Sequence, residues 1–228
     1  MGRHTFLTVL LFTALILAVA IFLPSGREPA AGRGDYPWNV TVDSEGFSTV
    51  FGISVGRSTV RQAAELIRDP AELSMFVASD GKQAVEVYFD RVAIGEIYAK
   101  VVLGVALDAA TLQGMYERGV RISNLGGGVR KVELHPDDRA RVSDAMIASL
   151  TYIPSVNLNA EVIRKRFGEP ARLLKERDSG LVHWLYPAIG LDLAVNDEGK
   201  EVLLYVKPTE FGRVTAPLQE MTEEIVIR

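Results

Sequence analysis

The sequence predicts an α+β protein: an N-terminal transmembrane helix, then two small lobes that each pack a helix on an antiparallel sheet, with a helical and hairpin segment between them. Three observations predict this fold class. An uncharged apolar run occupies residues 6–23. Alternating apolar and polar stretches, typical of half-buried strands, recur through the rest of the chain. A helix-and-turn pattern at residues 59–70 returns at residues 159–170.

Residues 1–24 are interpreted as a transmembrane signal anchor. The eighteen residues from Phe6 to Leu23 carry no charge, and about 17–25 apolar residues span a bilayer as a helix. Arg3 precedes the run, which favours an N-terminus in the cytoplasm and a body in the periplasm. We therefore expect a single-pass inner-membrane protein. The small residues Ala18-Val19-Ala20 leave a cleavable signal peptide open, and a buried core helix is a third interpretation.

The composition excludes several classes of function. The chain has no cysteine, which excludes disulfides, thiol catalysis, cysteine metal sites and lipidation on cysteine. The formal net charge is −4, and a mildly acidic body lacks the basic face that nucleic acid requires. We expect neither a nucleic-acid partner nor a cofactor.

Residues 25–37 are rich in Gly, Pro, Ala and charge, and predict a flexible linker. The first lobe follows at residues 38–150. Its first helix is expected to begin after an N-cap at Ser58 or Thr59 and to end at Asp69-Pro70. The strands expected next lie at residues 72–78, 84–90 and 94–107.

The middle segment is expected to hold two helices and a hairpin. Asp108 caps a helix that ends at Gly119, and residues 124–128 form a loose hairpin tip. His135-Pro136 opens the second helix, since Pro suits a first turn. Its apolar side is expected to comprise Val142, Ala145, Met146 and Leu150.

The second lobe, residues 151–228, repeats the first. Residue 159 aligns with residue 59 without a gap, so that Ile163 and Phe167 take the places of Ala63 and Ile67. A hairpin around residues 178–180 and strands at 190–195 and 201–207 are expected to follow. Two unrelated helix-hairpin units remain an alternative, because such units are common.

The second unit resembles a known family. Its helix, its Gly168-Glu169-Pro170 turn, its Trp184-Leu185-Tyr186 hairpin and its strand at residues 191–195 are similar to those of the SmpA/OmlA small envelope proteins. That resemblance implies a fold shared with the β-lactamase inhibitor protein and a module that binds proteins without chemistry. The first unit departs from it at Asp69, and the lipobox cysteine of the family is missing. The wider chain also resembles uncharacterised Gram-negative envelope proteins.

Candidate sites are few. His183 and Leu185 lie out of phase with Trp184 and Tyr186, which are expected to be core, so we expect both to face solvent and to bind a partner. A catalytic role of His183 would require a nucleophile or a second acid. His135 is explained by helix entry, and a metal site there would require further ligands.

The sequence thus predicts a non-enzymatic, membrane-anchored periplasmic binding or scaffold protein of envelope assembly or maintenance. Its expected partners are the inner membrane, through residues 6–23, and another envelope protein. The alternative is an envelope hydrolase or ligand-sensing module with a cleft between the lobes. A deep polar cleft lined by His183 and a carboxylate favours the enzyme, whereas a concave sheet with open edges favours binding.

Overall fold

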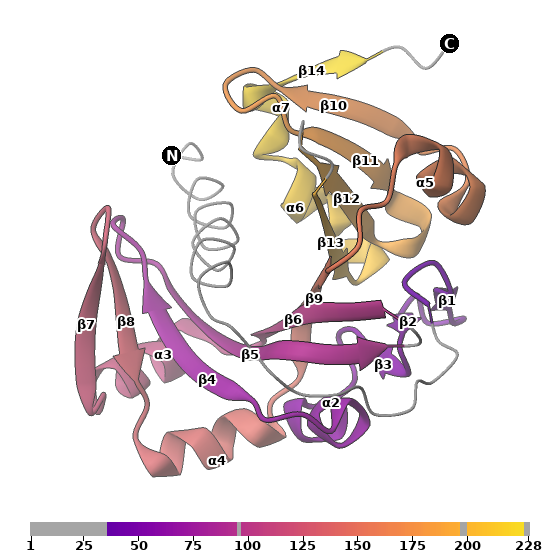
Figure 1. Ribbon diagram of the computed structural model, residues 1–228. Helices are drawn as coiled ribbons and strands as arrows, with labels where there is room; N and C mark the ends of the chain where they lie inside the picture. The colour runs from indigo at the N-terminus through magenta and orange to yellow at the C-terminus, as the bar shows by residue number, and fades with distance from the viewer. Residues whose placement is uncertain (1–35, 95–96, 197–199, 226–228) are drawn as a thin grey trace.

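The computed structural model describes residues 36–94, 97–196 and 200–225, and its main element is one large antiparallel sheet (Figure 1). The predicted anchor at residues 6–23 lies outside these ranges. Eleven strands pair in the order β14-β10-β11-β12-β13-β9-β6-β5-β4-β8-β7. A separate three-stranded sheet, β1-β2-β3, precedes them in the chain.

The strands are β1 (Thr41–Val42), β2 (Ser48–Val50), β3 (Ile53–Ser54), β4 (Glu72–Val77), β5 (Gln83–Ile94), β6 (Ile97–Val105), β7 (Arg121–Gly126), β8 (Val129–Glu133), β9 (Ile147–Pro154), β10 (Arg172–Glu176), β11 (Val182–Tyr186), β12 (Leu191–Val195), β13 (Glu201–Val206) and β14 (Thr222–Ile225). The helices are α2 (Val60–Ile67), α3 (Ala109–Glu117), α4 (Pro136–Asp144), α5 (Ala160–Phe167), α6 (Phe211–Thr215) and α7 (Leu218–Met221), with 3-10 turns at Pro187–Ile189 and Pro208–Glu210. None of these helices is long and apolar enough to cross a membrane.

The predicted fold class is wrong, because the two halves share one sheet and do not form separate lobes. Strand β9 pairs with β6 along one edge and with β13 along the other. The first residues of this strand, up to Leu150, are ones that the sequence pattern had assigned to the end of a helix. Helix α4 ends at Asp144, and Leu150 and Tyr152 are fully buried strand residues.

The repeated helices are confirmed at the predicted register. Thr59 accepts a hydrogen bond from the backbone N–H of Gln62, and Asn159 accepts the matching bond from Val162. Both helices run for eight residues. Ala63 and Ile163 are both fully buried in the same core cluster, so the two units share one hydrophobic core.

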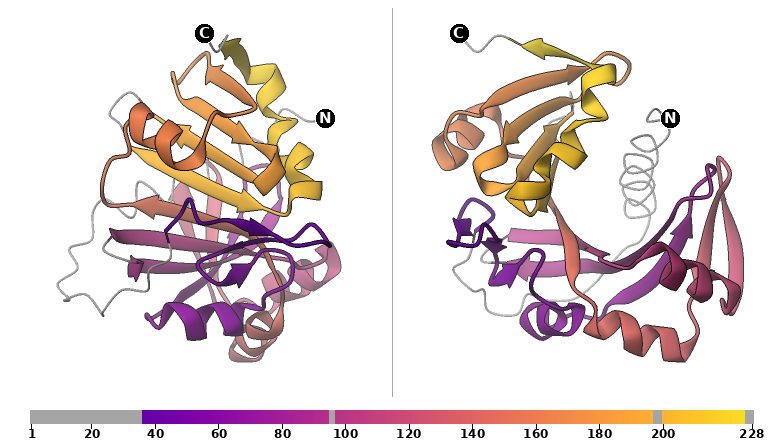
Figure 2. Two further views of the ribbon diagram at one scale, coloured as in Figure 1. Left: turned by 90° about the vertical axis from the view of Figure 1, so that its right-hand side faces the viewer. Right: turned by 180° about the vertical axis from the view of Figure 1, so that it is seen from behind.

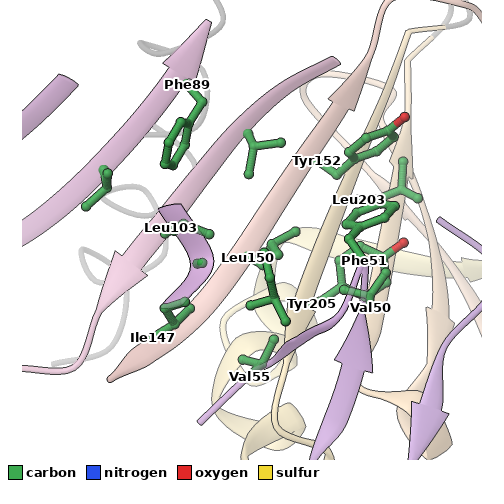
Figure 3. Packing of buried hydrophobic residues seen from close by; sticks show 14 of the residues in the cluster. Val50, Phe51, Val55, Phe89, Leu103, Ile147, Leu150, Tyr152, Leu203 and Tyr205 are labelled. Carbon is green, nitrogen blue, oxygen red and sulfur yellow. The ribbon is translucent and has the colours of Figure 1, made fainter. Parts of the chain in front are cut away.

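The core lies on the outer, convex face of the sheet. Figure 3 shows Phe51 packed against Tyr152 and Tyr205, with ring centroids 5.0 and 6.5 Å apart respectively. Phe51 has a φ of 55°, which is uncommon for a bulky residue. The two tyrosine rings hold this turn between β2 and β3 onto the large sheet.

The sheet is strongly curved, and its two halves face each other across a concave inner face (Figures 1 and 2). Pairing shifts register between Phe89 and Val92 and again between Gly104 and Val105. Such bulges bend a strand and increase its twist. Helices α6 and α7 lie on the inner face of the C-terminal half. There Phe211 and Leu218 pack with Leu174, Leu185 and Val206.

Candidate ligand-binding groove

Two rows of residues cross the inner face of the sheet, the first over four strands and the second over three. Strand pairing places Glu86 beside Gly104, Gly104 beside Ser149, and Ser149 beside Val206. The second row joins Val102, Thr151 and Leu204. Because successive strand residues point to opposite faces, the buried core residues Val85, Val87 and Leu103 point away from these rows.

The two rows line a groove of about 400 Å³, which we call the inner-face groove. Its wall on the C-terminal side is helix α6, through Arg213 and Val214. Small residues at Ala84, Gly104 and Ala148 keep the floor low. The volume falls in the range typical of small-molecule sites, about 300–1,000 Å³, which are mostly apolar with a few polar groups.

Glu86 is the acid of this groove. Its Oε2 atom is buried and has no hydrogen-bond partner among the described residues. Burial raises the pKa of Glu86 from its ordinary 4.5 to about 7. The neighbouring residues on the adjacent strands are Ser74 and Gly104, neither of which carries a charge. Near neutral pH the side chain therefore exists in both the protonated and the charged form.

His183 and Leu185 are both buried, and the expectation that they face solvent is wrong. They lie on the inner face of β11, as their alternation with Trp184 predicted, but helices α6 and α7 cover that face. Leu185 packs in the cluster with Phe211 and Leu218. His183 is 2% exposed. These two residues therefore offer no accessible surface for a partner.

His183 forms the centre of a buried ion triad with Glu176 and Asp192. Its Nδ1 lies 3.0 Å from each carboxylate oxygen of Asp192, and its Nε2 lies 3.2 Å from Oε1 of Glu176. Carboxylates only accept hydrogen bonds, so both ring nitrogens must carry protons for both bonds to form. The hydroxyl of Ser179 donates to the other oxygen of Glu176.

The triad shifts the pKa values of His183 and Glu176 in opposite directions. Burial alone would lower the pKa of His183, but the charges and hydrogen bonds of Asp192 and Glu176 outweigh it and raise the pKa to about 9. Burial alone would raise the pKa of Glu176, but hydrogen bonds from His183 and Ser179, together with the His183 charge, lower it. His183 is therefore an imidazolium at neutral pH.

The groove and the triad are separate features of the inner face. None of Glu176, His183 and Asp192 lines the inner-face groove. A polar cleft lined by His183 and a carboxylate, which would have favoured an enzyme, is therefore not formed by the described residues.

His135 has the structural role expected from the sequence. It is the N-cap of α4, and its Nδ1 accepts a hydrogen bond of 3.3 Å from the backbone N–H of Asp137. Within residues 36–94, 97–196 and 200–225, no group of three or more His, Asp or Glu side chains is arranged to hold a metal ion.

Sequence reasoning missed Glu86 as a functional candidate. The alternation of residues 84–90 did place it opposite Val85 and Val87, on the non-core face. No local pattern shows that Gly104, Ser149 and Val206, which are distant in sequence, complete a groove beside it.

Comparisons of the chain with protein-family models, with curated proteins and with solved structures found no match. The resemblance of the second unit to the SmpA/OmlA proteins therefore stays a prediction.

Proposed function

We propose that this chain is a non-enzymatic binding protein of the cell envelope, which takes up the apolar chain of an amphiphile in the inner-face groove. The observation that carries the proposal is the pair of side-chain rows across β5, β6, β9 and β13, closed on one side by α6. Of the two alternatives that the sequence left open, a hydrolase and a ligand-sensing module, this proposal corresponds to the ligand-sensing module. The groove binds the ligand and does not react with it.

The lining favours binding of an apolar chain. Val102, Leu204, Val206 and Val214 supply aliphatic walls, and Val102 is 4% exposed although it faces the groove side of the sheet. Each buried CH₂ contributes about 0.8 kcal/mol, and about 1.4 kcal/mol is a factor of ten in affinity. Two further methylenes therefore tighten binding roughly tenfold until the chain fills the groove.

The hydrolase alternative has less support. Acyl or phosphoryl chemistry needs a nucleophile hydrogen-bonded to a base. The groove contains the hydroxyls of Ser149 and Thr151, but the buried oxygen of Glu86 bonds to neither. His183, the strongest base candidate of the sequence, is enclosed with its two carboxylates.

The proposed location at the inner membrane also favours an amphiphilic ligand. An anchor at residues 6–23 holds the groove near the periplasmic surface of the inner membrane, where amphiphiles are concentrated. A role in envelope assembly or maintenance then follows from delivery or sensing of such molecules. A protein partner of the envelope would accept or supply the ligand.

The test is a chain-length series on a variant that starts at Tyr36. Folding of this variant is first checked by circular dichroism and a cooperative melt. Octanol, decanol and dodecanol are then titrated below their solubility limits in water. We expect affinity to rise roughly tenfold from one alcohol to the next and then to level off.

Two tryptophan variants locate the binding. Ala148→Trp places a large ring in the groove, whereas Ala110→Trp places the same ring on the exposed surface of α3. Binding should be lost in the first variant and unchanged in the second. Equal binding by both, or an affinity that does not depend on chain length, contradicts the proposed function.

A further inference from the structure

The charged residues that line the inner-face groove differ in whether they have an ion-pair partner. The two charged residues of its lining are Glu86 and Arg213. Arg213 is 82% exposed at its side chain and pairs with Glu210 at 3.2 Å. Glu86 is half-buried in the groove lining, and its Oε2 has no hydrogen-bond partner among the described residues. Within the groove lining, Arg213 therefore has an ion-pair partner, whereas Glu86 has none among the described residues.

Several ionisable groups on the neighbouring strands are engaged with one another. Tyr88, two residues along β5, donates its hydroxyl to Asp90 at 2.6 Å, and Lys100 lies 3.7 Å from the same carboxylate. Lys131 of β8 pairs with Glu72 of β4. From β9 and β13 the groove receives no ionisable side chain. Among the described residues, no cation forms an ion pair with Glu86, and no neighbouring charge contributes to the shift of its pKa.

We infer that the ligand of this groove carries a primary ammonium group on its apolar chain, and that this group pairs with Glu86. A buried carboxylate is costly unless it is paired and hydrogen-bonded. An ammonium can donate three hydrogen bonds. Those that Glu86 does not accept can be accepted by the hydroxyl oxygens of Ser149 and Thr151, which line the same groove. The overall acidity of the chain, with a net charge of −4, also favours a cation.

This inference rests on the proposed function, because it names the polar end of a ligand whose apolar chain occupies the groove. Ligands with the same apolar chain and different head groups test the proposed function and the ammonium inference separately. A neutral alcohol tests the groove alone, and an amine of equal chain length tests the pairing with Glu86.

The experiment uses the full chain in nanodiscs of zwitterionic lipid and three photo-reactive decyl probes: an amine, an alcohol and a carboxylate. Labelled peptides are identified by mass spectrometry, and labelling is counted in β5, β6, β9 and β13. The same probes are applied to Glu86→Gln and to Glu65→Gln, which removes an exposed acid from α2 on the outer side of the sheet. Partition of each probe into the lipid is the same for all three proteins, so their comparison isolates the groove.

We expect the wild-type protein and Glu65→Gln to take up the amine on the order of tenfold more efficiently than the alcohol, and the carboxylate least of all. Glu86→Gln should take up amine and alcohol about equally. The preference for the amine in the wild-type protein should also weaken as the pH falls from 8 to about 5.5, because protonation removes the charge of Glu86. Thermal melts check that all three proteins are folded.

Equal labelling by amine and alcohol in the wild-type protein overturns the ammonium inference but leaves the proposed function standing. Preference for the carboxylate has the same consequence. An amine preference that persists in Glu86→Gln also overturns the inference, because the cation then binds elsewhere. Absence of groove labelling by all three probes overturns the proposed function and the inference together.

Discussion

Two regions of the same sheet face treat buried charge in opposite ways. On β10, β11 and β12, the inner face is covered by α6 and α7, and the acids Glu176 and Asp192 are paired through His183. On β5 and β6 the inner face carries a groove, and the buried oxygen of Glu86 has no partner among the described residues. Charges that satisfy one another serve the fold, whereas a charge left unsatisfied in a groove indicates a place for a ligand.

The largest effect is expected from His183→Ala. Removal of the imidazolium leaves two buried carboxylates beside each other, and breaking a buried pair in this way costs about 3–5 kcal/mol of unfolding free energy. Urea unfolding monitored by tryptophan fluorescence measures the change. A midpoint equal to that of the wild-type protein would show that the triad is not formed, and the contrast between the two regions would be lost.

Leu185→Ser should be the next most damaging substitution. The side chain is 3% exposed and packs under α6 and α7. Its replacement leaves a cavity and buries a hydroxyl, a loss of about 2–5 kcal/mol. The sequence alone predicted an exposed residue and no change in stability. Urea unfolding decides between the two, with Ile122→Ser as a control, since Ile122 is 49% exposed on the edge strand β7.

The pH dependence of stability should separate the two regions. His183 has its pKa raised from 6.5 to about 9, so the folded state binds the proton more tightly than the unfolded chain. Its stabilising contribution is complete below about pH 6.5 and is lost as the pH rises through 9. Glu86 has its pKa raised from 4.5 to about 7, so its contribution is complete below about 4.5 and is lost by about 7.

Urea midpoints measured from pH 4 to pH 10 test both windows. Glu86→Gln should flatten part of the decline between pH 4.5 and 7, while Glu201, whose pKa burial also raises to about 7, retains the rest. His183→Ala should remove the decline above pH 6.5. A wild-type protein whose stability rises between pH 7 and 9 would contradict the assignment of His183.

The smallest effect is expected from Glu86→Gln at pH 8. The amide is about the same size as the carboxylate and carries no charge, so the variant avoids the cost of ionising Glu86 and should be more stable than the wild-type protein. If Glu86 were paired with a buried cation, the substitution would instead lower the free energy of unfolding by several kcal/mol. The measurement is the urea midpoint at pH 8, with Glu65→Gln as the exposed control.

Local features of the fold could be predicted from the sequence. The N-caps Thr59, Asp108 and Asn159 each accept a backbone hydrogen bond at the expected helix start. The alternation of residues along β11 also correctly predicted that His183 and Leu185 lie on the opposite face of the strand from Trp184. These features depend on neighbours within a few residues, which a single sequence displays directly.

Features that depend on distant segments could not be predicted. The residues of β9 follow a helix so closely that Leu150 was assigned to its apolar side, although Leu150 and Tyr152 alternate with Ser149 and Thr151. The cover over His183 comes from α6 and α7, whose apolar residues Phe211, Val214, Leu218 and Met221 do recur at helical spacing. That spacing was the available signal, but it does not say which sheet face the helices cover.

Methyl NMR of the protein starting at Tyr36, titrated with decanol, shows directly whether the inner-face groove binds an apolar chain. The methyl groups of Val102 and Leu204 report on the inner-face groove, and those of Leu174 and Leu185 report on the covered region. We expect saturable shifts at Val102 and Leu204 and little change at Leu174 and Leu185. Shifts that are larger at Leu174 and Leu185, or no saturable shift at Val102 and Leu204, would contradict the proposed binding.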